Sequence, residues 1–188
     1  MTTTALNELI AELRADIRWP EVYKPETAPL CARNAKVISA PVARVWAWLT
    51  YADSWPQWYP NAQDVEFRIW PGPTLQPGSV FNWTTFGLRL TSTVHDFEIE
   101  RRLGWVAQAD GVLAYHTWYL HRLSDSETLV ITDETQISTL GIWATDRFTQ
   151  GLVEQHDIWL DALNTKAQSG FPPASDHRTP SHESLRYS

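Results

Sequence analysis

The sequence has little of what builds the commonest catalytic and metal sites. It contains a single cysteine, Cys31, which excludes an intrachain disulfide and a zinc site built from cysteines. The G-x-S-x-G, H-E-x-x-H, P-loop and glycine-rich dinucleotide motifs are all missing. These absences argue against serine hydrolases of that type, zincins, P-loop enzymes and Rossmann oxidoreductases. What remains is acid–base chemistry by scattered polar side chains, or binding alone, and we expect neither a cofactor nor a metal ion.

Positive charge and long apolar runs are also scarce. The 188 residues carry 15 Lys and Arg against 22 Asp and Glu, a net charge of −7, and contain no basic block. We therefore expect neither nucleic acid nor an anionic membrane as a partner. No apolar run approaches the roughly 18 residues of a membrane span, and no basic segment followed by an apolar one stands at the N-terminus. The sequence is thus typical of a cytoplasmic protein with a single core.

Tryptophan, by contrast, is abundant, with 11 residues in the chain. The stretch "WPQWYP", residues 55–60, holds two Trp, one Tyr and two Pro in six positions. Such aromatic area is unusual for a surface loop, because exposed rings forfeit the free energy that burial supplies. We expect this stretch either to belong to the core or to form part of the wall of a ligand cavity.

Helical periodicity marks both ends of the chain. Residues 5–18 place Leu and Ile at helical spacing, and this apolar stripe must pack on the domain or on a second subunit, as in a homodimer formed through this helix. Prolines then break the periodicity, so residues 1–31 are interpreted as an N-terminal helix and a proline-rich linker. A long helix is predicted over about 145–167, and residues 169–188 are predicted to form a disordered tail.

Residues 32–168 have the pattern of one α+β domain. A strand at 32–39 is followed by two short helices, after which the apolar period becomes two. Further strands are predicted at 63–70, 79–86, 88–99, 104–109, 113–122 and 128–138. Their short connections predict an antiparallel meander. A curved antiparallel sheet of about seven strands, wrapped around the long C-terminal helix, would bury every apolar stripe, and a gap between the two would be a cavity.

Four stretches of this domain resemble a known superfamily. "ISAPVARVWAWLTYADSWPQWYP" joins a strand end, an Ala-Pro pair, a Val-Trp helix and a Trp-x-x-Trp-x-Pro turn. "GSVFNWTTFGLRLTSTVHDFEIERRLGW", "YHTWYL" and "LVITDETQ" match its later strands and last hairpin. Over about residues 32–167 the chain is similar to the START-like, helix-grip superfamily (Bet v 1-like, SRPBCC), and within it to the polyketide cyclase/dehydrase-type proteins. The resemblance implies the helix-grip fold and a small-molecule ligand, in a superfamily of cyclases, aromatases, lipid carriers and simple binders.

The helix-grip arrangement implies where a ligand would lie. The second short helix borders the mouth of the cavity, so Trp55, Trp58 and Tyr59 are expected to divide between anchoring this helix and forming the entrance. The cavity is expected to be apolar, with a volume on the order of 300 Å³ or more. On the long helix, Gln155 or His156 is expected to reach it. The candidate ligand-binding residues are completed by Trp83, Thr85, Ser92, Trp118 and Trp159, and on the long helix Gln155 is the one selected.

His116 and Glu134 are the candidate catalytic residues. His116 shares a strand face with Trp118, and an imidazole can transfer protons near neutral pH. Asp133 and Glu134 are adjacent in a strand, so one of them points inward, and the resemblance favours Glu134. A carboxylate among Trp side chains would have a raised pKa and could act as an acid or a base. The alternatives are a structural histidine in a filled barrel and an ion pair of Glu134 with an Arg. His95 is separated from His116 by a strand, so no metal site is expected from these two.

Two functions are consistent with these residues. One is an enzyme of polyketide cyclase/aromatase type, whose cavity holds the substrate in a reactive shape while one or two polar groups move protons. The other is a carrier or sensor of a hydrophobic or aromatic small ligand, without turnover. Convergent polar side chains in the cavity would favour the enzyme, and a wholly apolar lining would favour the carrier.

Overall fold

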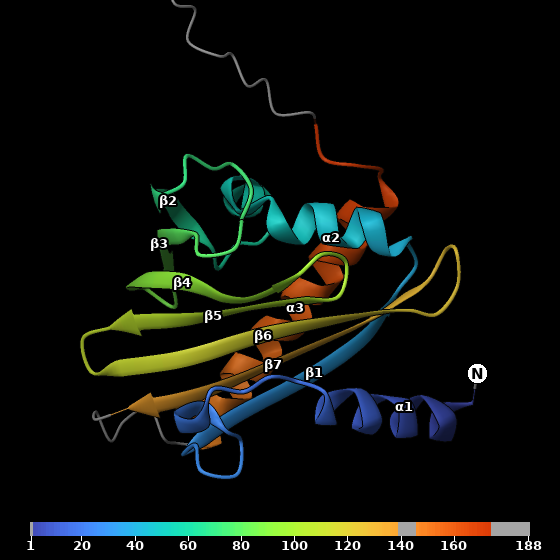
Figure 1. Ribbon diagram of the computed structural model, residues 1–188, viewed down its shortest axis with the longest axis horizontal. Coiled ribbons are helices and arrows are strands. Elements are labelled where there is room, and N and C mark those ends of the chain that lie inside the picture. Colours follow the sequence, from blue (N-terminus) through green and yellow to red (C-terminus); the bar gives the residue numbers. More distant parts are fainter. Residues whose placement is uncertain (1, 139–145, 174–188) are drawn as a thin grey trace, which may run out of the picture.

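The segments of alternating polarity form one seven-stranded antiparallel sheet in the computed structural model, which describes residues 2–138 and 146–173 (Figure 1). The strands are β1 (Leu30–Ile38), β2 (Gln63–Ile69), β3 (Val80–Thr85), β4 (Leu88–Glu98), β5 (Arg102–Ala109), β6 (Val112–Arg122) and β7 (Thr128–Ser138). Their order in the sheet is β1-β7-β6-β5-β4-β3-β2, so only β1 departs from chain order, by pairing with β7. The predicted meander is confirmed, because short turns allow only neighbouring strands to pair.

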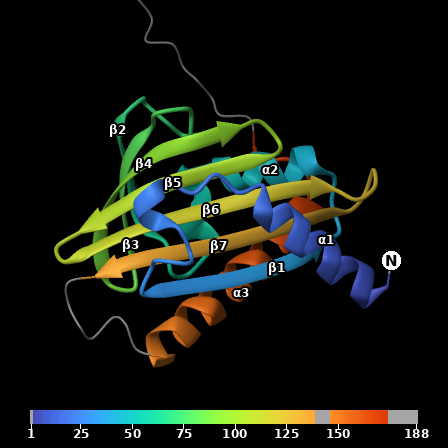
Figure 2. The ribbon, with the colours of Figure 1, turned by 60° about the horizontal axis from the view of Figure 1, so that its bottom comes forward.

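Helices cover both faces of this sheet. They are α1 (Thr3–Ala15), α2 (Val42–Thr50) and α3 (Asp146–Gln168), with the 3₁₀ turns η1 (Glu21–Tyr23) and η2 (Ala52–Gln57). Helix α3 lies against one face, and Figure 2 shows α1 on the opposite face, across β6, β7 and β1. The curved sheet gripping α3 is the predicted helix-grip fold.

The alternation along β6 shows how the sheet is buried on both faces. Trp118 and Leu120 point toward α3 and belong to the main core. Tyr119 points the other way and packs with Leu13 of α1. Tyr115, on that same outer face, contacts Trp19 of the linker at 5.6 Å between ring centroids. The N-terminal segment therefore serves as the second layer over a sheet that the domain alone would leave exposed on one side.

Helix α1 places its apolar stripe on its own sheet. Leu13 and Ile17 are buried against Tyr119, Leu129 and Ile131. The domain itself is thus one of the two alternative packing partners expected for the stripe. The homodimer through this helix stays a prediction.

The "WPQWYP" stretch belongs mainly to the core. Trp55 is fully buried, and its Nε1 donates to the Leu49 carbonyl at 3.0 Å. Trp58 is half-buried and donates to Ser54 Oγ at 3.0 Å. Of the three rings, only Tyr59 lines the pocket between the sheet and α3.

The segment after α3 begins in contact with α2. The Gly170 carbonyl accepts a hydrogen bond from Trp48 Nε1 at 2.8 Å, and Phe171 lies under the Arg44 guanidinium. Residues 174–188 of the predicted tail lie outside the described residues, so their disorder stays a prediction. None of the helices in the described part of the chain combines the length and apolar character needed to cross a membrane.

Candidate functional site

A small pocket lies between the sheet and α3, with a volume of about 40 Å³. Its wall is mostly apolar and includes three tryptophans, Trp83, Trp105 and Trp159. This volume is far below the predicted 300 Å³, so the predicted size is wrong for this conformation. The tryptophan rings explain the difference: Trp159 packs edge-on against Trp55 at 5.1 Å and thereby fills the concave face of the sheet.

Six of the residues selected from sequence lie on the pocket wall. They are Tyr59, Trp83, Thr85, His116, Glu134 and Trp159. Tyr59 stacks on Trp159 with ring centroids 4.3 Å apart, which holds η2 against α3. These six side chains line the pocket, and their roles in binding and catalysis stay predictions.

Five other candidates lie away from the wall. Trp55 and Trp58 anchor η2, as described above. Ser92 is buried one layer back, where its Oγ accepts from Trp83 Nε1 at 2.9 Å. Trp118 lies behind the His116 ring, at 5.2 Å between centroids. Gln155 is half-buried off the pocket, because the phase of α3 turns the next residue, His156, inward instead.

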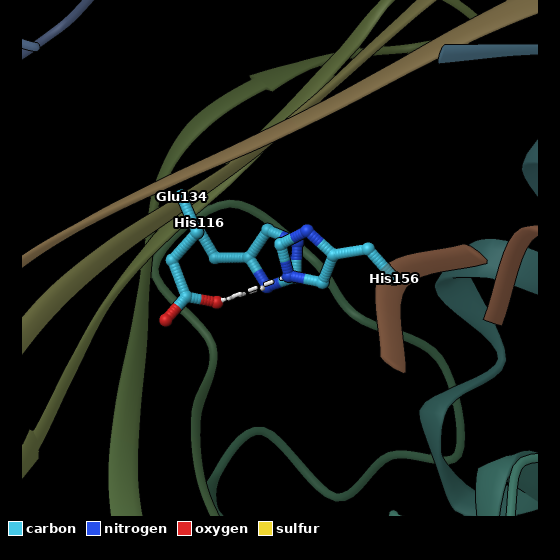
Figure 3. A group of neighbouring side chains, drawn as sticks. All are labelled: His116, Glu134 and His156. Atoms are coloured by element: carbon cyan, nitrogen blue, oxygen red, sulfur yellow. Dashed lines mark hydrogen bonds and ion pairs between the residues drawn. The ribbon is translucent and has the colours of Figure 1, made fainter. Parts of the chain in front are cut away.

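Glu134 and His116 meet at the polar end of the pocket. They are directly paired across β6 and β7, and His116 Nδ1 lies 3.2 Å from Glu134 Oε2. His156 reaches the same oxygen from α3, with its Nε2 3.4 Å away (Figure 3). The two imidazole rings stack at 4.7 Å between centroids. One carboxylate oxygen therefore faces two imidazole nitrogens inside the protein.

Asp133, the neighbour of Glu134, faces the other side of the sheet. Its carboxylate accepts from Arg14 Nε at 2.9 Å and from an Arg14 terminal nitrogen at 3.0 Å. Burial raises the pKa of Asp133, against the opposing hydrogen bond and charge of Arg14. The choice of Glu134 as the inward carboxylate is therefore confirmed.

A second layer of hydrogen bonds holds the outer atoms of the cluster. Asn34 of β1 donates its amide to the Val153 carbonyl at 3.0 Å and to Asp157 Oδ1 at 2.7 Å, both of which only accept. Asn34 Oδ1 is therefore the atom that faces His156 Nδ1 at 3.1 Å, and His156 must carry a proton on Nδ1. Two more contacts belong to this layer. Thr132 Oγ1 lies 2.7 Å from His116 Nε2, and the Gln136 side-chain amide donates to Glu134 Oε1 at 2.6 Å.

The protonation of the cluster follows from these contacts. Burial raises the pKa of Glu134, but the hydrogen bond from His156 and the electrostatic influence of the two imidazoles outweigh it and hold the pKa below its usual range. The raised pKa that we expected for Glu134 is therefore wrong, because that expectation took account of the surrounding Trp side chains and not of a second imidazole. Burial lowers the pKa of His116 to about 3, despite the nearby Glu134 charge. His116 is thus a neutral imidazole that donates from Nδ1 to the Glu134 carboxylate and accepts from the Thr132 hydroxyl.

His156 is the residue of this cluster that the sequence named only as the alternative to Gln155. It lies one turn before Trp159 on α3, so the apolar stripe contained the signal that this position faces inward. The three side chains offer one donor atom each within 4.8 Å of one another, a grouping that can hold a metal ion. The sequence predicted no metal site from His95 and His116, and in the structure His95 lies exposed on the other face of the sheet, against Tyr115.

Comparison with known proteins agrees with this fold. Residues 30–167 match the family model described as polyketide cyclase/dehydrase and lipid transport. The chain belongs to this family. A comparison with curated proteins gives no significant match.

Solved structures show the same architecture as this polyketide cyclase/dehydrase family member. A hypothetical protein of Helicobacter pylori is 24 % identical, with a TM-score of 0.74 over 80 % of this chain and 95 % of that chain. The aromatase/cyclase of Streptomyces sp. R1128 is 16 % identical, with a TM-score of 0.63 over 76 % of this chain and 98 % of that one. A START superfamily protein of Mycobacterium smegmatis is 12 % identical, with a TM-score of 0.64 over 74 % and 97 %. At these identities the likeness establishes the fold alone.

Proposed function

We propose that this family member is a small-molecule enzyme of polyketide cyclase/aromatase type that acts in the cytoplasm on a hydrophobic or aromatic substrate. The observation that carries the proposal is Glu134, whose carboxylate oxygen faces two imidazoles at the polar end of a mostly apolar pocket. The family description and the aromatase/cyclase among the structural neighbours support it.

The cluster fits the proton transfers of ring closure. The Glu134 carboxylate takes a proton from a carbon between two carbonyl groups, and the resulting carbanion attacks a third carbonyl of the same substrate. An imidazole of His116 or His156 gives its N–H proton to the oxygen of that carbonyl and takes up the proton that Glu134 has gained, so both groups return to their starting state, and loss of water follows in an aromatisation. The apolar wall would hold the chain in the folded shape that this reaction needs.

Substrate entry requires side chains to move. A void of about 40 Å³ is too small for a bicyclic or larger substrate. Phe86 and Phe148 contact each other at 5.9 Å and both border the pocket, so they are the side chains that a substrate would have to displace.

The test uses metal-free protein and a panel of poly-β-ketones and aromatic ketones, with ring closure and water loss followed by mass spectrometry. Glu134→Gln and His116→Ala are expected to lower turnover by at least about 10²-fold, the usual contribution of general acid–base catalysis. Affinity, measured by quenching of tryptophan fluorescence, should change much less. His95→Ala is the matched control. Full turnover in both variants would overturn the assignment of these residues.

The second candidate function is a carrier or sensor without turnover. The mostly apolar lining of the pocket favours it. Quenching of tryptophan fluorescence by the same ligands, with no chemical change in any of them, would select this function over the enzyme.

A further inference from the structure

The cluster of His116, Glu134 and His156 has the donor set of a metal centre, and we infer that it binds one divalent first-row transition-metal ion of the Zn²⁺ class. Two imidazoles and one carboxylate are ligands that such ions favour, whereas Mg²⁺ and Ca²⁺ prefer oxygen ligands throughout. The inference goes beyond the proposed function, which involves no metal ion.

The donor atoms have the spacing of a coordination shell. Glu134 Oε2 lies 3.2 Å from His116 Nδ1 and 3.4 Å from His156 Nε2. In a tetrahedral site with bonds of about 2.0 Å, neighbouring ligand atoms are about 3.3 Å apart. The three side chains come from β6, β7 and α3, so the fold itself brings the ligands together, and an ion would draw the two rings closer by side-chain rotation.

Each of the three ligands is also held at its outer atom. Asn34 Oδ1 holds His156 Nδ1, Thr132 Oγ1 holds His116 Nε2, and Gln136 holds Glu134 Oε1. Metal-binding histidines and carboxylates commonly have such outer partners, which fix the tautomer and the ring orientation. Here all of them are in place around a cluster that is almost fully buried.

The contact between His156 and Glu134 itself requires a cation. Because Asn34 fixes the proton on Nδ1, a neutral His156 turns the lone pair of Nε2 toward the carboxylate oxygen. Two acceptors 3.4 Å apart are stable only with a cation between them, which is a proton in the metal-free protein and the metal ion in the loaded one. His116 Nδ1 can also become a ligand of the ion. The Thr132 hydroxyl can donate or accept, so it allows the His116 proton to move from Nδ1 to Nε2.

The ion would leave one coordination position for a ligand from the pocket. Three protein ligands with an open fourth position are the arrangement of catalytic rather than structural zinc sites. An ion of charge +2 beside one carboxylate keeps a net charge of +1 in apolar surroundings, so the fourth ligand should be anionic, such as hydroxide or an enolate oxygen. The metal ion and the shared proton exclude each other, so the loaded protein would lose the acid–base form of the cluster.

The experiment measures Zn²⁺ binding to the chelator-treated full chain by calorimetry, and Co²⁺ binding by visible absorption. The parent is His177→Ala/His182→Ala, which removes the two histidines near the C-terminus. We expect one ion per chain, with affinity at least about tenfold weaker in Glu134→Gln, in His156→Ala and in the outer variant Thr132→Val. His95→Ala should bind like the parent. Unchanged affinity in Glu134→Gln, or no binding by the parent, would overturn the inference.

A second measurement uses the parent protein alone, so it remains informative if the variants of the cluster residues do not fold. On adding Zn²⁺ to the parent, the NMR signals of the His116 and His156 rings should shift, and those of His95 and His121 should not. The opposite pattern would show surface binding and contradict the site. Neither measurement involves turnover, so failure of the proposed enzyme activity leaves this test intact, and the reverse also holds.

Discussion

At the scale of single residues, Asn34 of β1 decides the state of a cluster that lies on three other elements, β6, β7 and α3. It is buried, and its amide is committed to two acceptors on α3. Its carbonyl oxygen is thereby left to accept from His156, which fixes the histidine tautomer. One side chain on β1 thus sets which nitrogen of His156 faces Glu134.

Asn34→Ala is expected to destabilise the protein by about 1–3 kcal/mol, because it leaves the buried His156 Nδ1–H without a partner. The measurement is urea unfolding followed by tryptophan fluorescence. The control is Lys36→Ala, two residues along β1, where the Nζ contact with Asp161 is exposed and worth about 0–1 kcal/mol. Equal effects of the two variants would contradict the buried role of Asn34.

At the scale of elements, the β5–β6 pair requires a glycine. A Cβ on Gly104 would lie 2.6 Å from the Tyr115 hydroxyl oxygen and 3.1 Å from the carbon that bears it. That hydroxyl is buried and has no hydrogen-bond partner among the described residues. The aromatic layer of Tyr115 with Trp19 and Tyr23 therefore packs directly over a position without a side chain.

Gly104→Ala is expected to cost about 1–3 kcal/mol of unfolding free energy through overpacking, more than the reduced freedom of the unfolded chain returns. The same substitution in a Tyr115→Phe background should cost at least about 0.5 kcal/mol less, since the closest clashing atom is gone. Thermal and urea unfolding of the four proteins give this coupling. An additive result would mean that the two residues do not meet.

At the scale of the whole molecule, the N-terminal segment is tied to the domain by ion pairs between layers, of which the pair of Arg14 with Asp133 has the most buried carboxylate. Arg14 of α1 is a quarter exposed and holds both oxygens of Asp133, whose side chain is 1 % exposed. Asp133 directly precedes Glu134 on β7. Asp133 therefore contacts α1 on the outer face of the sheet, while Glu134 lines the pocket on the opposite face. Detaching α1 would leave Asp133, on the outer face of the sheet, with only the longer contact to Arg33 Nε at 4.0 Å.

Arg14→Ala is expected to destabilise the protein by about 1–3 kcal/mol, less than a fully buried pair because Arg14 is partly solvated. Asp133→Asn, which removes the charge that needs a partner, should reduce the additional effect of Arg14→Ala. Arg18→Ala, on an exposed position one turn further on, should stay within about 0.5 kcal/mol of the parent. Hydrogen exchange of α1 and urea unfolding provide the measurements, and an Arg14→Ala protein as stable as Arg18→Ala would refute the tie.

The sequence alone determined the strands, the antiparallel order and the long helix, and it narrowed the inward carboxylate to Asp133 or Glu134. These follow from local periodicity: alternation fixes which side chains share a face, and short turns fix which strands are neighbours. It also determined that His116 and Glu134 could be paired, because both depend on the register of one hairpin.

Only the tertiary structure decided the rest of the site. Gln155 and His156 differ by one step of about 100° on α3, and only the docking of that helix onto β1 and β7 shows which of them faces Glu134. The pocket volume was beyond the sequence, because it is a small difference between the space inside the sheet and the combined volume of the rings that fill it. The lowered pKa of Glu134 depends on His156 from a distant element, and no pattern along one strand contains a contact between chain segments 22 residues apart.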